Sequence, residues 1–272
     1  ETIADMLKIS NYRTFAVGKW HLGAHQSLRP MKRGFDKFFG TLTGAGNFYN
    51  PPTLMLEDKF IQVESTDFHY TDEISNHAVR MLNEKNSDPF FMYVAFTAPH
   101  WPLHAWEDDI SKYEGKYRKG WSQTRMDRYE EMRGKVLDTK WKLTKEDPAT
   151  PNWDEIKNKD WEDLRMATYS AQIEQMDRGI GKIIDKLKSN GEFENTVIRA
   201  EANRINRERF EKDGYTEDTV LGYNDSASGR AYRFYSGKHL LSESSTKVEK
   251  LNQLGVNQGV AVVETARKNI ET

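Results

Sequence analysis

Two short segments of the sequence carry side chains suited to chemistry on an anion. Lys19 and His21 lie in the segment Gly18-Lys-Trp-His-Leu-Gly23, and His100 lies in Pro99-His-Trp-Pro102. An ammonium group supplies a positive charge, and an imidazole can donate hydrogen bonds or exchange a proton near neutral pH. These residue types together suit a tetrahedral anion, so we predict an anion site built from Lys19, His21 and His100.

The elements before these segments read as parallel strands. The runs 13–17 and 90–96 are short and rich in aromatic and β-branched residues, and a helical pattern from residues 70–72 to about residue 86 separates them. This order is typical of an α/β sheet. Ligands bind beyond the carboxyl ends of the strands in open α/β sheets, so we expect the three side chains to converge on one pocket there.

Other segments yield more expectations. Residues 2–10 should form a short helix, and residues 23–50 should be loop-rich, with irregular turns instead of regular elements. An amphipathic helix should pack on the sheet and end at Asn190-Gly191, with this apolar face: Met166, Tyr169, Ile173, Met176, Ile180, Ile183, Ile184 and Leu187. Thr71 or Asp72 should cap the helix that begins near residue 70.

Five ordered blocks resemble the sulfatase family. They cover residues 2–23, 33–40, 89–104, 172–181 and 195–198, and include Gly18-Lys-Trp-His-Leu-Gly23 and Arg33-Gly-Phe-Asp-Lys-Phe-Phe-Gly40. The resemblance implies an alkaline-phosphatase-like α/β fold and an enzyme that hydrolyses sulfuric esters, as arylsulfatases do. The expected fold is therefore a partial alkaline-phosphatase-like sheet flanked by helices, with an unassigned, mainly helical tail.

The resemblance also implies roles for individual residues. Lys19 matches the family lysine that contacts both the sulfate and the formylglycine nucleophile, and His21 matches the histidine that hydrogen-bonds the formylglycine hydrate and helps its collapse. His100 matches the residue that binds the sulfate or the leaving group. His104 is near enough in sequence to border the pocket, so we expect substrate binding by Lys19, His100 and His104.

Other candidate residues have no chemical role in this interpretation. We interpret three further histidines as structural or surface residues, and two aspartates as structural positions of the family that are not metal ligands. These are His25, His69 and His77, and Asp36 and Asp177.

The sequence departs from the family in two places. The family nucleophile lies in a Cys/Ser-x-Pro-x-Arg motif upstream of the first matched block, but this chain begins at Glu1 and has no cysteine. After Ile198 the family reads Ser-Asp-Asn-Gly and completes its metal site, whereas this chain reads Arg199-Ala-Glu-Ala-Asn-Arg204. We therefore expect a fragment that lacks the first strand, its acidic pair and the nucleophile, and that is catalytically incomplete. Ca²⁺ is expected for the intact family, but we assign no metal ligand in this chain.

The chain divides into two parts in this interpretation. Residues 1–198 form a partial catalytic domain, in which 105–160 is a Trp- and Tyr-rich, cap-like insertion, and residues 199–272 form a tail of unknown origin. Residues 200–212, 247–254 and 260–270 are expected to be helical, so that the tail does not complete the sheet. The segment Ser226-Ala-Ser-Gly-Arg230 has the spacing of the nucleophile motif but lacks its proline, and we reject it as a site.

Composition limits the partners. A net charge of −2 and an isoelectric point near 6.5 provide no general attraction to nucleic acid or to an anionic membrane. No run approaches the length of about 18 apolar residues that a spanning helix needs. The expected partner is a sulfate ester of an aryl or sugar compound. The resemblance implies a periplasmic or secreted location, but the sequence itself fixes neither the compartment nor the oligomeric state.

Two alternatives stay open. Sulfate and phosphate share tetrahedral geometry, so a phosphoryl-transfer enzyme of the same fold is one alternative. A non-catalytic binding or interaction protein on a sulfatase scaffold is the other, and an upstream nucleophile motif would argue against it.

Overall fold

The computed structural model describes residues 2–84, 87–135, 140, 142–201 and 260–265. Seven strands of these residues form one sheet in the order β4-β3-β2-β1-β5-β7-β6. Their bounds are β1 Arg13–Lys19, β2 Lys37–Thr41, β3 Leu54–Leu56, β4 Lys59–Phe60, β5 Phe90–Ala95, β6 Thr196–Glu201 and β7 Val260–Thr265.

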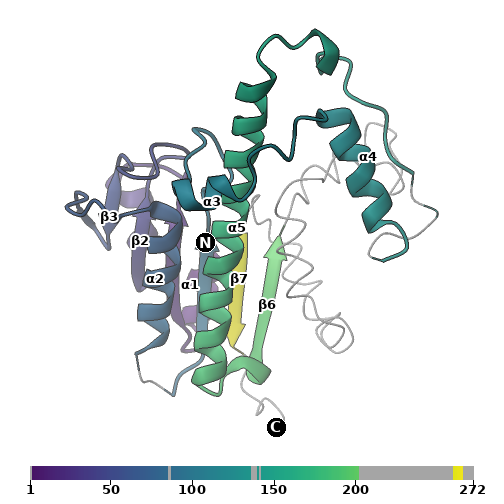
Figure 1. The fold of residues 1–272 in the computed structure, drawn as a ribbon. Helices are drawn as coiled ribbons and strands as arrows, with labels where there is room; N and C mark the ends of the chain where they lie inside the picture. Colours follow the sequence, from purple (N-terminus) through teal and green to yellow (C-terminus); the bar gives the residue numbers. More distant parts are fainter. Residues whose placement is uncertain (1, 85–86, 136–139, 141, 202–259, 266–272) are drawn as a thin grey trace.

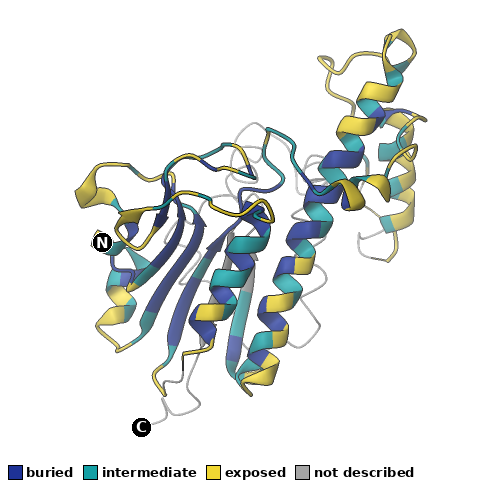
Figure 2. Ribbon diagram, turned by 60° about the vertical axis from the view of Figure 1, so that its left-hand side comes forward, coloured by how far each residue is buried: buried dark blue, intermediate teal, exposed yellow. Residues whose placement is uncertain are grey.

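The centre of the sheet is parallel, as predicted. β1 pairs in parallel with β2 on one side and with β5 on the other, and the paired residues include Gly18 with Gly40 and Gly18 with Ala95. β3 and β4 continue the sheet as antiparallel strands beyond β2. The strands β1, β2 and β5 therefore end at the same edge, and Figure 2 shows the loops that follow them crossing above the buried strands.

β2 corrects one prediction. It lies inside residues 23–50, which were expected to contain only irregular turns. Phe38 and Phe39 are both buried, on opposite faces of the sheet, and together they stabilise the strand. A Cβ atom at Gly40 would lie 1.8 Å from the carbonyl oxygen of Gly18. The glycines that suggested turns instead let two neighbouring strands approach closely.

Helices cover both faces of the sheet. α2 (Tyr70–Leu82) and α5 (Lys159–Ser189) lie side by side on one face, and α1 (Ile3–Lys8) lies on the other (Figure 1). The sheet has a hydrophobic core on each face, and alternate residues of β1 belong to different cores. Phe15 and Val17 pack under α2 and α5, whereas Ala16 faces the α1 side. α2 and α5 approach closely where Gly179 meets Ser75, since a Cβ atom at Gly179 would lie 2.2 Å from the Ser75 Oγ.

The buried face of α5 differs from the predicted one in its first half. Met176, Ile183, Ile184 and Leu187 are buried as expected, but Met166, Tyr169 and Ile173 are only partly buried. The buried residues in that half include Asp163, Thr168 and Gln172. The reason is that Asp163 accepts hydrogen bonds from the backbone N–H groups of Gly115 (2.6 Å) and Tyr117 (2.7 Å), so a polar loop, not the sheet, covers this part of the helix.

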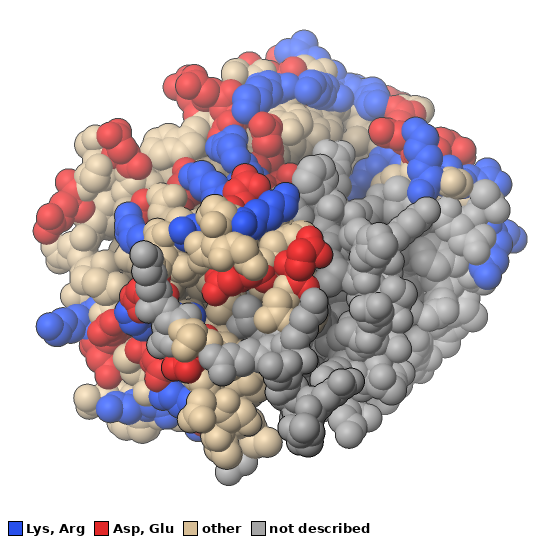
Figure 3. Space-filling model, turned by 90° about the horizontal axis from the view of Figure 1, so that it is seen from below, with Lys and Arg blue, Asp and Glu red and all other residues tan. Residues whose placement is uncertain are grey.

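The described part of residues 105–160, which the sequence predicts to be an insertion, lies partly beyond the sheet. It contains α3 (Glu107–Ser111), which packs on α5, and α4 (Trp121–Met132), which stands away from the sheet beside the first turns of α5 (Figure 1). On the face shown in Figure 3, lysine, arginine and acidic side chains are mixed over the described part of the surface. Across the described segments, no helix has the length and apolar character needed to cross a membrane.

The described part of the tail corrects another prediction. Residues 260–265 form a strand, not part of a helix, and β7 pairs antiparallel with both β5 and β6. Val260-Ala-Val-Val263 is a short β-branched apolar run, which suits a strand. Ala200 and Glu201 likewise extend β6, which is the last strand of the sheet among the described residues. The helices predicted over 202–212, 247–254 and 266–270, and the rejected motif at 226–230, lie outside the described residues.

Candidate active site

Gly18 fixes the path of the chain at the end of β1. Its φ of +100° is unfavourable for a residue with a side chain, and a Cβ atom there would lie 1.9 Å from the carbonyl oxygen of Ala95 in β5. Only glycine allows this close approach of the two strands. Gly18 therefore brings β1 close to β5 just before Lys19, the last residue of β1, which pairs with Thr41 of β2.

Lys19 is half-buried. Burial lowers the pKa of its ammonium group, since removal from water disfavours the charged form. No carboxylate among the described residues lies within 4.0 Å of this ammonium group. Its neighbour Trp20 is buried, and the indole Nε1 donates a hydrogen bond of 2.9 Å to the Leu28 carbonyl. Lys19 is thus a positive charge at the strand end with no acidic partner in the described chain.

His21 is exposed and is held by backbone contacts. Its φ is +53°, and its N–H donates a hydrogen bond of 3.2 Å to the carbonyl of Leu42, just after β2. The imidazole lies over Gly44, where a Cβ atom would come within 2.5 Å of the ring. A side chain at residue 44 would displace the imidazole. The sequence shows this glycine only as part of a loop, so its link to His21 could not be foreseen.

His100 follows β5 after a short turn. Its N–H donates a hydrogen bond of 2.9 Å to the Thr97 carbonyl, and its Nδ1 lies 2.6 Å from the carbonyl oxygen of Trp101. A carbonyl oxygen only accepts, so Nδ1 carries the proton and donates it. The other nitrogen, Nε2, is then the atom with which His100 can act on a ligand, as an acceptor when the ring is neutral and as a donor when it is protonated.

The topology brings the three predicted residues to one edge of the sheet. β1 and β5 are parallel neighbours, so Lys19 and His21 on one side and His100 on the other all follow the carboxyl ends of adjacent strands. This is the edge at which ligands bind in open α/β sheets. Their joint contact with one ligand remains a prediction.

His104 and His69 hold the segment after β5 against α2. The buried His69 caps α2, because its Nδ1 accepts the N–H of Thr71 at 3.3 Å, and its Nε2 then donates to the carbonyl of His104 at 3.3 Å. This corrects the predicted cap at Thr71 or Asp72. Burial lowers the pKa of His69 to about 4, which keeps the ring neutral and able to make both bonds.

His104 itself packs among aromatic rings. Its Nδ1 accepts a hydrogen bond of 3.3 Å from the N–H of Phe48, so its proton lies on Nε2, and burial lowers the pKa of the ring. The ring centroids of Tyr49 and His104 are 5.5 Å apart, and those of His69 and Trp106 are 5.4 Å apart. The structural role predicted for His69 fits these contacts, while His104 presents an N–H donor that does not depend on protonation.

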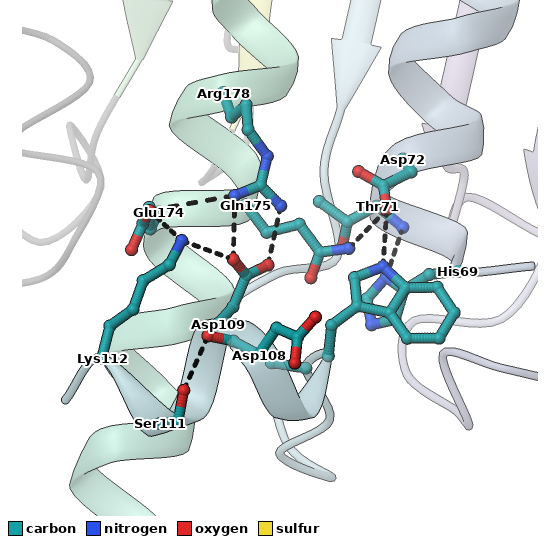
Figure 4. A network of polar contacts seen from close by, with 12 residues as sticks. His69, Thr71, Asp72, Asp108, Asp109, Ser111, Lys112, Glu174, Gln175 and Arg178 are labelled. Carbon is teal, nitrogen blue, oxygen red and sulfur yellow. Dashed lines mark hydrogen bonds and ion pairs between the residues drawn. The ribbon is translucent and has the colours of Figure 1, made fainter. Parts of the chain in front are cut away.

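A second polar network ties α2, α3 and α5 together (Figure 4). Asp72 accepts hydrogen bonds from the Trp106 indole at 2.9 Å and from the Gln175 amide at 2.7 Å. Asp109 accepts two hydrogen bonds from Arg178, at 3.0 and 2.7 Å, and one from Lys112 at 2.8 Å. Asp109 is paired with two cations and Asp72 accepts two hydrogen bonds from neutral side chains, so we assign both carboxylates to structure and not to ligand binding.

The described residues do not by themselves fit a metal ion. No group of three or more histidine, aspartate or glutamate side chains among them could hold one. Three described carboxylates already have partners: Asp72 and Asp109 in the network of Figure 4, and Asp36, which lies beside Thr14 at the opposite end of β1 from Lys19, with Lys8 at 2.7 Å. A hard cation such as Ca²⁺ needs several oxygen ligands, so no step of the chemistry below depends on one.

Comparison with known proteins identifies the family. A family model described as Sulfatase matches residues 1–199. The chain belongs to the sulfatase family. It is 31% identical over 216 residues to an uncharacterised sulfatase of Schizosaccharomyces pombe and 29% identical over 223 residues to an arylsulfatase of Klebsiella aerogenes. Each match covers 72% of this chain, but only 39% and 45% of those relatives.

Solved structures show similar coverage. A crystal structure of Ps i-CgsB matches with a TM-score of 0.48 and 26% identity, over 72% of this chain and 38% of that one. A second, of Ps i-CgsB in complex with k-i-k-neocarrahexaose, matches with a TM-score of 0.49 and 19% identity, over 98% of this chain and 48% of that one. This chain therefore spans less than half the length of the relatives and structures it matches.

Proposed function

We propose that this sulfatase chain forms the sulfate-binding side of a sulfuric ester hydrolase active site, with Lys19, His21 and His100 as the residues that touch the substrate. The observation that carries the proposal is the environment of the Lys19 ammonium group. This group is half-buried at the carboxyl edge of the sheet, beside the strand that leads to His100, and has no acidic partner among the described residues. A positive charge held in this way fits an anionic ligand.

Each residue has a task in this proposal. Lys19 binds a sulfate oxygen as a point charge, which stabilises the negative charge that develops as the ester bond breaks. His100 donates from Nε2 to the sulfate or the leaving oxygen when its ring is protonated, because its Nδ1 proton is already given to the carbonyl of Trp101. His21 is exposed above Gly44, where it can accept or return a proton.

We further propose that these 272 residues alone do not turn over a sulfate ester. The sequence contains no cysteine and no Ser-x-Pro-x-Arg segment, so the family nucleophile is not encoded in it. The expected substrate is the sulfate ester of an aryl or sugar compound, and any Ca²⁺ of the intact family would need ligands beyond the described residues. Binding without turnover is therefore the predicted behaviour.

An assay with 4-methylumbelliferyl sulfate tests this directly. We expect no turnover from the purified chain, while inorganic sulfate still binds. Turnover that survives rigorous purification and disappears in Ser226→Ala would contradict the proposal and place the nucleophile in the tail. Phosphate that binds much more tightly than sulfate would instead favour a phosphoryl-transfer relative. Absence of binding by either anion would favour a non-catalytic scaffold.

A further inference from the structure

Trp101 is the most exposed tryptophan among those the structure describes. Its exposed fraction is 71%, whereas Trp20 is only 4% exposed. Trp106, five residues further on in the same segment, is partly buried and its indole N–H is bonded to Asp72. Trp101 therefore presents a large aromatic surface that contributes little to the core, and tryptophan is enriched at interfaces.

The segment that carries Trp101 is held firmly on both sides. Before it, the His100 N–H bonds to the Thr97 carbonyl at 2.9 Å. After it, the Tyr49 hydroxyl donates to the Ala105 carbonyl at 2.6 Å, and His69 donates to the His104 carbonyl at 3.3 Å. The ring is thus presented by an anchored backbone, which reduces the entropy that ligand binding must overcome.

Trp101 also lies directly beside a residue proposed to bind sulfate. Its carbonyl oxygen accepts the Nδ1 proton of His100 at 2.6 Å, and the two ring centroids are 5.3 Å apart with planes inclined by 38°. The same residue therefore orients the imidazole through its backbone and offers an apolar surface through its side chain. Leu22, next to His21, adds another exposed apolar side chain at this edge, with an exposed fraction of 53%.

We infer that Trp101 binds the ring of the alcohol portion of the substrate, so that the preferred esters carry their sulfate on an aryl or pyranose ring. The inference rests on the proposed sulfate site and adds the surface that selects the leaving group. An indole face stacks on the flat apolar face of either kind of ring. An ester without a ring gains nothing from it.

Equilibrium binding by calorimetry tests this with four probes: 2-naphthyl sulfate, methyl sulfate, inorganic sulfate and uncharged 2-naphthol. We expect Trp101→Ala to weaken 2-naphthyl sulfate about 5- to 10-fold, as for loss of a stacked aromatic pair, and to leave methyl sulfate unchanged. Trp101→Phe should lose less affinity for 2-naphthyl sulfate, because phenylalanine keeps an aromatic ring. Trp161→Ala is the matched control, since Trp161 is also exposed, at 54%, but lies in the first turn of α5.

The outcomes separate the two proposals. Equal weakening of 2-naphthyl and methyl sulfate by Trp101→Ala, the same loss in Trp161→Ala, or no preference of the wild-type chain for the ring would overturn the role of Trp101. If wild type binds 2-naphthol in a Trp101-dependent way but binds neither sulfate nor methyl sulfate, the ring site stands and the sulfate site is wrong. Circular dichroism of each variant ensures that the comparison is between folded proteins.

Discussion

At the scale of the residue, the charge of Lys19 should favour sulfate binding but destabilise the fold. Burial lowers the pKa of its ammonium, which means that the fold disfavours the charge that a sulfate would require. We therefore expect Lys19→Met to raise the melting temperature and to weaken sulfate binding. Thermal unfolding monitored by circular dichroism measures the first effect, and Lys32→Met, which changes an exposed lysine, is the control. A lower melting temperature for Lys19→Met would show that Lys19 has a stabilising partner.

The candidate residues can be predicted from the sequence, but the contacts that fix their positions cannot. Gly18-Lys-Trp-His-Leu-Gly23 and Pro99-His-Trp-Pro102 could be assigned to strand ends because the apolar runs before them are unambiguous. The contact of Gly44 with His21 joins residues far apart in the chain. The proton positions on His69, His100 and His104 follow from backbone groups that only the folded chain brings near. A sequence pattern contains neither kind of information.

At the scale of the element, Asp109 joins α3 to α5. Hydrogen bonds from Arg178 hold the pKa of the Asp109 carboxyl below its usual value, and Lys112 adds a further bond. Asp109→Ala should destabilise the fold by about 1–3 kcal/mol, less than a fully buried pair, because Arg178 is partly in water. Urea unfolding measures the change. Asp108→Ala, on the same helix but exposed, should have almost no effect; equal losses in both variants would remove the special role of Asp109.

The elements were predictable where one local signal dominated. Apolar periodicity predicts five elements to within a few residues of their bounds: α1, β1, α2, β5 and the C-terminal half of α5. The sequence does not predict β2, because glycine occurs both in turns and between closely spaced strands. It predicts a helix at β7, because a short apolar run such as Val260-Ala-Val-Val263 fits both a helix and a strand until its neighbours in the sheet are known.

At the scale of the whole molecule, two histidines with lowered pKa values should make the free energy of unfolding depend on pH. Burial lowers the pKa of His69, and that of His77, to about 4, whereas an unfolded histidine titrates near 6.5. Between these values the unfolded chain binds more protons, so stability rises with pH and is lost on acidification. We expect protonation linked to His69 alone to lower the free energy of unfolding by about 2 kcal/mol between pH 7.5 and pH 5.

Chemical denaturation at the two pH values measures this dependence. His69→Gln should reduce the loss between them, although it lowers stability at both because the bonds to Thr71 and His104 weaken. His25→Gln is the control, since His25 is exposed. A dependence on pH that His69→Gln leaves unchanged would show that other groups cause it.

The proposed function depends above all on the binding of sulfate by Lys19 and His100 at the carboxyl edge of this sheet. The most direct measurement is calorimetric titration of inorganic sulfate into the wild-type chain, Lys19→Ala, His100→Ala and the control Lys32→Ala. We predict one site in the wild type and in Lys32→Ala, with affinity reduced roughly 10- to 100-fold in Lys19→Ala and His100→Ala, as expected when a hydrogen bond to a charged group is lost. Sulfate affinity that is equal in all four proteins, or sulfate binding that is absent from the wild type, would contradict this assignment.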